Sequence, residues 1–117
     1  AVIGSIDKGN TSISFDATGG KEALLITEKI DFTKYNTLTV DLSSVTANNN
    51  TVGFIVYFST TETYSASTTL AQLTCSTSGT HTLNISDVTG SGYMIFGALS
   101  WGKTDTAKAT LTKLNMT

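Results

Sequence analysis

The stretch Leu38-Thr39-Val40-Asp41-Leu42 decides the fold class of this 117-residue chain. Its apolar residues recur at every second position, and successive side chains of a β-strand point to opposite faces. Leu38, Val40 and Leu42 are therefore predicted to point into a core, while Thr39 and Asp41 face water. This alternation indicates a half-buried strand.

The same period of two recurs along the chain in short runs separated by Gly, Asn, Asp and Ser clusters. The expected shared faces are Ile13 with Phe15, Leu24 with Ile26, Ala71 with Leu73 and Cys75, Leu83 with Ile85, and Ala107 with Ala109 and Leu111. Leu114 and Met116 have the opposite parity, so a β-bulge is expected near Thr112 or Lys113. About eight strands with frequent turn signals predict an all-β fold, a two-sheet antiparallel β-sandwich of the jelly-roll kind.

Two runs, 52–58 and 93–99, are apolar at both parities. Strands of this kind are usually central and covered on both sides. The second face is therefore covered by a long loop, by another domain or by another copy of the chain, or it lines a ligand groove. The segment 31–35 is the one plausible helical turn in an otherwise strand-like sequence.

The composition agrees with this fold class. The chain has 23 threonines and 13 serines but only 14% charged residues, three glutamates and no arginine. Threonine is β-branched and suits the half-exposed face of a strand, whereas the charged residues that normally coat helices are scarce. The length favours one domain over residues 1–117, which we expect to be a fragment of a larger protein.

Several functional classes are disfavoured by the same numbers. A single cysteine, Cys75, excludes an internal disulfide and a multi-cysteine zinc site. The net charge of −2 and seven scattered lysines argue against a nucleic-acid partner, and no apolar run approaches the ~20 residues that cross a membrane. His81 is the only histidine, and no pair of carboxylates is singled out by spacing, so we expect no enzyme activity.

Recognition is the chemistry that remains. Trp101 begins a Gly-containing polar loop, where an indole can stack on a sugar ring or, alternatively, cap the end of the core. Tyr64 lies in the polar stretch 60–68, and Lys103 and Asp105 can bond ligand hydroxyls or be solvated loop charges. Asn49 offers an amide to a ligand, although an asparagine triplet between strands is also typical of a turn.

Two longer phrases resemble a known family. Residues 29–41 read KIDFTKYNTLTVD, and residues 81–97 read HTLNISDVTGSGYMIFG. Both are similar to phrases in jelly-roll domains of the carbohydrate-binding-module type, found in tail, baseplate and receptor-binding proteins of phages and prophages of Gram-positive bacteria. Sugar-binding members often hold structural calcium, but the nine carboxylates here lack a calcium-loop spacing, so no cofactor is expected.

The resemblance implies a phage tail domain that contacts host-surface carbohydrate, located in the virion or at a cell surface. Its partners would be a cell-surface saccharide and other phage structural proteins, and the domain would form a homo-oligomer such as a trimer. The alternative is a structural domain of a fibre or bacterial surface protein that has no sugar ligand. The doubly apolar runs 52–58 and 93–99 favour this alternative, because large exposed apolar patches are rare on monomers.

Overall fold

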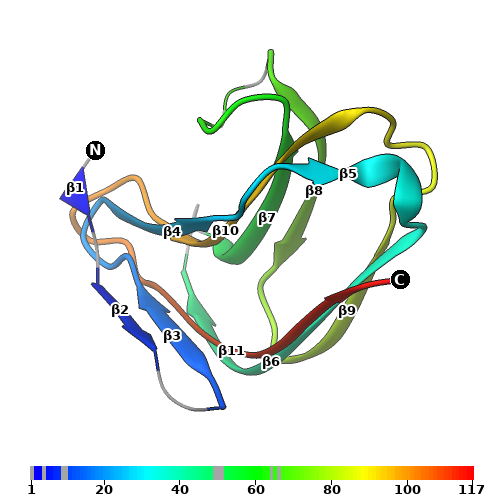
Figure 1. Cartoon of the computed structure of the whole chain (residues 1–117). Helices are drawn as coiled ribbons and strands as arrows, with labels where there is room; N and C mark the ends of the chain where they lie inside the picture. Colours follow the sequence, from blue (N-terminus) through cyan, green and yellow to red (C-terminus); the bar gives the residue numbers. More distant parts are fainter. Residues whose placement is uncertain (1, 4, 9–10, 49–51, 64, 66) are drawn as a thin grey trace.

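The computed structural model describes residues 2–3, 5–8, 11–48, 52–63, 65 and 67–117. Eleven strands and one short 3-10 helix form within these described residues (Figure 1). In chain order they are β1 (Val2–Ile3), β2 (Ser5–Lys8), β3 (Ile13–Asp16), β4 (Lys21–Ile26), β5 (Ile30–Asp31), η1 (Phe32–Lys34), β6 (Thr37–Ala47), β7 (Val52–Ser59), β8 (Thr69–Cys75), β9 (Gly79–Asn84), β10 (Ser91–Leu99) and β11 (Ala107–Met116). The strands beyond the expected eight are short ones of two to four residues, such as β1, β2 and β5.

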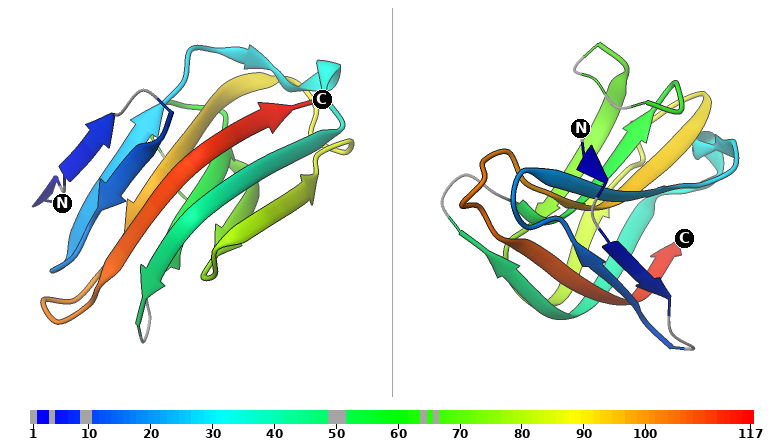
Figure 2. Two further views of the ribbon diagram at one scale, coloured as in Figure 1. Left: turned by 90° about the horizontal axis from the view of Figure 1, so that it is seen from below. Right: turned by 90° about the vertical axis from the view of Figure 1, so that its left-hand side faces the viewer.

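The strands form two packed sheets, which confirms the predicted all-β sandwich (Figure 2). One sheet has the order β1-β4-β10-β7-β8, with β5 also paired to β10, and is called the β10 sheet below. The other has the order β2-β3-β11-β6-β9 and is called the β11 sheet. All neighbours are antiparallel except β1 and β4, which pair in parallel.

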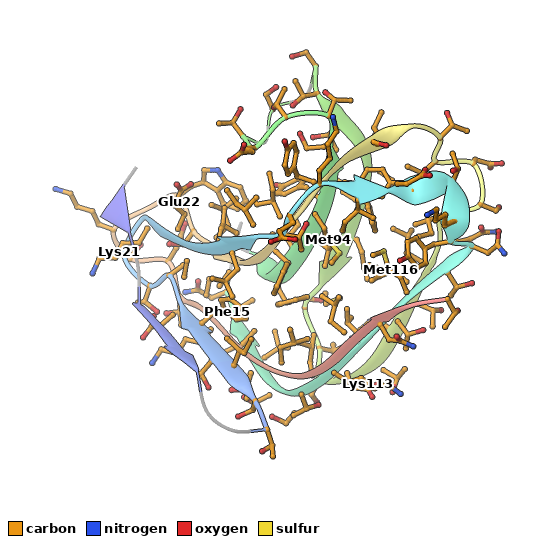
Figure 3. The ribbon with its side chains drawn as sticks, viewed as in Figure 1. Phe15, Lys21, Glu22, Met94, Lys113 and Met116 are labelled. Carbon is orange, nitrogen blue, oxygen red and sulfur yellow. The ribbon has the colours of Figure 1, made fainter. Side chains whose placement is uncertain are left out.

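The core lies between the two sheets and is built from the alternating positions that the sequence indicates. Leu38 and Val40 are fully buried and Leu42 nearly so. Phe15 from the β11 sheet meets Phe54 of the β10 sheet with ring centroids 5.9 Å apart. Figure 3 shows Phe15 and Met94 pointing into this interior from opposite layers.

The predicted change of parity in β11 is confirmed. The register of β11 against β6 shifts between Thr110 and Leu111 and again between Leu111 and Lys113. Because of these irregularities, Leu114 and Met116 pack against the same core as Leu111. An extra residue in one strand of a pair reverses the facing of all residues that follow it.

The helical turn is present as η1. Asp31 caps it, because the carboxylate oxygen Oδ1 accepts the backbone N–H of Thr33 at 3.1 Å. Phe32 is fully buried and meets Phe58 edge to face at 5.1 Å. The turn therefore closes one end of the sandwich with an aromatic side chain.

The outer face of the β10 sheet is apolar, as the doubly apolar runs predict. Ile55 and Ile95 are not part of the core that lies between the two sheets. Their exposed fractions are nevertheless only 2% and 1% within the single chain. Ile95 lies between Ile26 and Tyr57 in the register of the sheet. At Ile55 and Ile95 the second face is thus buried within the single chain.

The sequence of β4 leaves open which of its apolar residues face the core. Leu24 and Ile26 do share one face, but this is the outer face of the β10 sheet, because Ala23 is fully buried and Leu25 packs on the core. Ile26 remains 48% exposed. Since β4 is apolar at both parities, only its pairing with β10 decides which set faces inward.

Candidate binding site

The loop 100–106 joins β10 to β11 and carries the most exposed large apolar side chain of the described residues. Trp101 is 59% exposed, compared with 48% for Ile26 and 43% for Leu70. The indole is not part of the core cluster. Of the two roles expected for Trp101, the structure therefore favours a side chain presented to solvent over a cap on the core.

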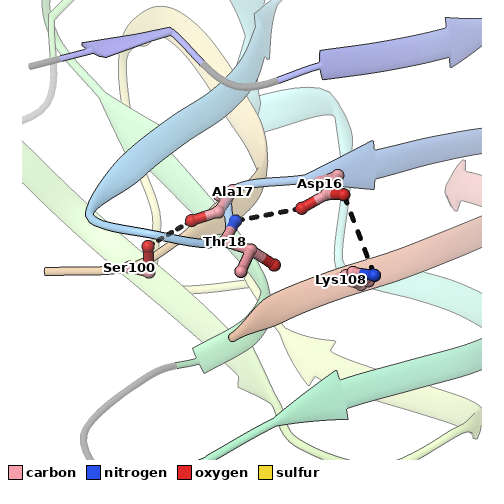
Figure 4. A network of polar contacts seen from close by, with 5 residues as sticks. All are labelled: Asp16, Ala17, Thr18, Ser100 and Lys108. Atoms are coloured by element: carbon pink, nitrogen blue, oxygen red, sulfur yellow. Dashed lines mark hydrogen bonds and ion pairs between the residues drawn. The ribbon is translucent and has the colours of Figure 1, made fainter. Parts of the chain in front are cut away.

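Ser100 anchors this loop to the turn between β3 and β4. Its hydroxyl donates a hydrogen bond to the carbonyl oxygen of Ala17 (Figure 4). The Ser100 hydroxyl oxygen also accepts hydrogen bonds from the backbone N–H groups of Gly20 at 2.9 Å and Lys21 at 3.1 Å. One buried hydroxyl thus satisfies three backbone groups, which holds the residue next to Trp101 in place.

Gly20 permits the close approach of the two segments. It has a φ of +75°, and a Cβ atom there would lie 3.2 Å from the carbonyl oxygen of Trp101. Glycine adopts positive φ at little steric cost, whereas other residues rarely do. The backbone of Trp101 is therefore packed directly against the turn between β3 and β4.

Asp105 closes the loop on itself. Its Oδ2 accepts the N–H of Gly102 at 2.8 Å, and its own N–H donates to the carbonyl of Gly102 at 3.0 Å. Its carbonyl also accepts the N–H of Gly19 at 2.9 Å. Asp105 is only 8% exposed, so the geometry gives it a role in shaping the loop, and its contact with a ligand stays a prediction.

Asn48, at the end of β6, holds the other side of the loop. Its Oδ1 accepts the N–H of Thr106 at 2.7 Å, and its Nδ2 donates to the carbonyl of Thr104 at 3.4 Å. Asn49, the predicted ligand contact, lies outside the described residues. Lys103 is exposed on the same loop, two residues after Trp101, and its contact with a ligand stays a prediction.

The loop between β7 and β8 lies elsewhere. Thr60 and Thr68 close it with a backbone hydrogen bond of 3.0 Å, directly after Ser59, which pairs with Tyr93 near the start of β10. The loop 100–106 follows the other end of β10, and the two loops lie far apart in Figures 1 and 2. Tyr64 itself lies outside the described residues, and its part in binding stays a prediction.

An internal network of hydroxyl groups supports the loop between β7 and β8. The fully buried hydroxyl of Ser59 donates to the carbonyl of Thr63 at 3.0 Å and accepts the N–H of Thr61 at 3.2 Å. Figure 1 shows the loop rising on the side of the β10 sheet that faces away from the β11 sheet. The abundant Ser and Thr residues thus shape this loop through their own hydrogen bonds.

The reactive side chains are engaged or buried. His81 Nε2 lies 2.8 Å from the carbonyl oxygen of Thr77, within the connection between β8 and β9. Cys75 is 1% exposed, and burial raises the pKa of its thiol to about 11. A thiol with such a pKa is a poor nucleophile at neutral pH.

The described residues form neither a metal-binding cluster nor a membrane-spanning helix. No group of three or more His, Cys, Asp or Glu side chains there is placed to hold a metal ion. No helix there is long and apolar enough to span a membrane.

Sequence reasoning singled out Trp101 as a candidate but missed the residues that anchor its loop. Ser100 sits at the end of an apolar strand, and a hydroxyl in such a position is a weak signal of a buried anchor. Asn48 belongs to the asparagine triplet, where its amide looks like a turn signal. Their partners lie 58 and 80 residues away along the chain, so no local pattern points to them.

Neither a family model nor a curated protein matches this chain. The class that the fold and the loop define is a two-sheet β-sandwich domain that presents one indole on an anchored loop.

Proposed function

We propose that the domain is a non-catalytic recognition module that binds a cell-surface saccharide through the loop 100–106. The observation that carries this proposal is the 59% exposed indole of Trp101 on a backbone anchored by Ser100, Asp105 and Asn48. An exposed aromatic face on an anchored backbone can stack on the apolar face of a pyranose without first ordering the loop.

The surroundings of the indole suit a polar ligand. Lys103 and Thr104 are exposed on the same loop and supply hydrogen-bond donors and acceptors for sugar hydroxyls. A single indole with a few polar groups buries a small area, so the affinity of one domain is expected to be weak. Display of several copies on one particle would raise the effective affinity, as in a phage tail.

The resemblance to jelly-roll domains of phage tail and receptor-binding proteins supports the same class of ligand. On this proposal the domain acts in host attachment, at the virion tail or another extracellular surface. The saccharide belongs to the cell wall or surface of the host.

The experiment compares binding of the wild type and Trp101→Ala to a glycan array and to host cell walls, with each protein displayed on a tetrameric carrier. Leu70→Ala is the matched control, because Leu70 is also an exposed large apolar residue and lies on β8. We expect the Trp101 variant to lose binding with an unchanged melting temperature, while the Leu70 variant binds like the wild type. Equal binding by Trp101→Ala would refute the assignment of the site.

A structural or assembly role without a sugar ligand is the second candidate. It is favoured by the exposed side chains of Ile26 and Leu70, which both lie on the outer face of the β10 sheet. It is weakened by the burial of Ile55 and Ile95 within the single chain. Absence of saccharide binding at every valency would favour this second candidate.

A further inference from the structure

One side of β11 has a partner strand for only part of its length. β11 pairs with β6 from Ala107 to Met116, but β3 covers its other side only from Lys108 to Leu111. In the left view of Figure 2, β3 ends well before the arrowhead of β11. Within the described residues, the segment 112–116 therefore has no strand on its β3 side.

The hydrogen bonds show which backbone groups face this open side. Thr117 and Thr37 exchange both of their backbone hydrogen bonds, each 3.0 Å long. In an antiparallel pair, residues alternate between exchanging these bonds and facing away. Asn115 therefore faces β6 as Thr117 does, while the N–H and C=O groups of Leu114 and Met116 face the open side.

A groove of about 480 Å³ lies beside this edge. Its apolar lining comes from Ile13, Phe96, Leu111 and Leu114. Figure 3 shows Met116 pointing into the interior between the two sheets, as the core positions of β11 do. An occupant must therefore offer paired backbone donors and acceptors on one side and apolar side chains at alternate positions, which describes an extended strand.

We propose that this edge is the interface of a symmetric dimer, in which the end of β11 pairs antiparallel with the same segment of a second copy. The segment supplies the alternation that the edge requires, with Leu114 and Met116 inward and Asn115 between them. A two-fold axis lets one surface complement itself.

One register pairs the open backbone groups of Leu114 and Met116. Leu114 lies opposite Met116 of the second copy, Met116 lies opposite Leu114 of the second copy, and the axis passes beside Asn115. Each copy then pairs both N–H and both C=O groups of these two residues. The inward side chain of Met116 from the second copy then lies next to Leu114, beside the groove, and the two β11 sheets become one continuous sheet.

The dimer leaves the loop 100–106 free, because this loop precedes the other end of β11. The interface is small and does not depend on any saccharide. We therefore expect a dimer that forms reversibly and is populated at high protein concentration.

The test uses two single-cysteine substitutions, Asn115→Cys and Lys113→Cys, both at exposed positions of β11. In the proposed register Asn115 faces itself in a non-hydrogen-bonded pair, where Cα atoms are about 4.5 Å apart, within the range that a disulfide spans. The two Lys113 positions are separated by four residues along the strands, or roughly 13 Å, which is too far. The native Cys75 is buried and serves as the internal control in the wild type.

We expect Asn115→Cys to form a covalent dimer under mild oxidation, while Lys113→Cys and the wild type stay monomeric on non-reducing gels. Sedimentation of the wild type should show a concentration-dependent dimer. Equal cross-linking of both cysteine variants, or none in Asn115→Cys, would overturn the proposed register. A strictly monomeric wild type at millimolar concentration would overturn the dimer.

Discussion

Replacing Ser100 with alanine removes the most connected side chain of the Trp101 loop. The hydroxyl donates to the carbonyl of Ala17 and accepts the N–H groups of Gly20 and Lys21, and Ser100 is only 5% exposed. Alanine keeps the backbone and most of the volume, so the change isolates these hydrogen bonds. The three backbone groups then lose their partner in a site with little access to water.

The magnitude follows from the number of bonds. A hydrogen bond contributes roughly 1 kcal/mol net, so Ser100→Ala should lower the free energy of unfolding by about 3 kcal/mol. For a domain of this size, such a loss corresponds to a fall in melting temperature of about 10 °C.

The assay is urea and thermal unfolding followed by circular dichroism of the β-sheet signal. Ser44→Ala is the matched control, because Ser44 is exposed and its hydroxyl donates only to Thr110 Oγ1 at 3.2 Å. The control should stay within about 0.5 kcal/mol of the wild type. A Ser100→Ala variant as stable as Ser44→Ala would refute the view that this hydroxyl holds the loop.

Three further predictions concern other parts of the fold. Gly97→Ala should lower the free energy of unfolding in urea by more than about 3 kcal/mol. The φ of Gly97 is +151°, and the new Cβ would clash with the Ala23 carbonyl oxygen. Cys75 should react with a thiol reagent only when urea unfolds the chain, since burial raises its pKa; fast labelling of the native protein would contradict this. The Thr18 backbone N–H bonded to Asp16 lowers the pKa of that carboxyl, so the stability it contributes is present at neutral pH and is lost as pH falls through the folded-state pKa. Acid should therefore destabilise Asp16→Asn less than the wild type, and identical pH profiles in urea unfolding would count against this role.

The proposed dimer would also affect the proposed binding of saccharide. A dimer that continues the β11 sheet carries two Trp101 loops on one particle, which raises the apparent affinity for a multivalent surface. Because the two sites involve different ends of β11, Trp101→Ala should leave the dimer intact. The two proposals can thus fail separately.

Much of the strand pattern was predictable from local sequence. The alternation at Leu38, Val40 and Leu42 gave the inward face of β6, and the parity change before Leu114 gave the bulge in β11. Such features depend on residues close together in the chain, since the side-chain period of a strand is two. They need no knowledge of the partner strands.

The facing of β4 could not be predicted in this way. Leu24 and Leu25 are both apolar, and each parity offers an equally good inward face. Pairing with β10 places Leu24 opposite Gly97 on the outer face and turns Ala23 into the core. The pairing within the sheet, and not the sequence of the strand, therefore determines which face of β4 is inward.

The sequence by itself determined that this chain folds as an all-β sandwich and that an indole follows one of its central strands. Only the tertiary structure decided that the loop bearing Trp101 is anchored by Ser100 and Asn48, and that the end of β11 is left without a neighbour on one side. The physical reason is distance along the chain. Alternation and turn chemistry act between adjacent residues, whereas these features arise where segments 58 to 80 residues apart meet and where one strand is shorter than its partner.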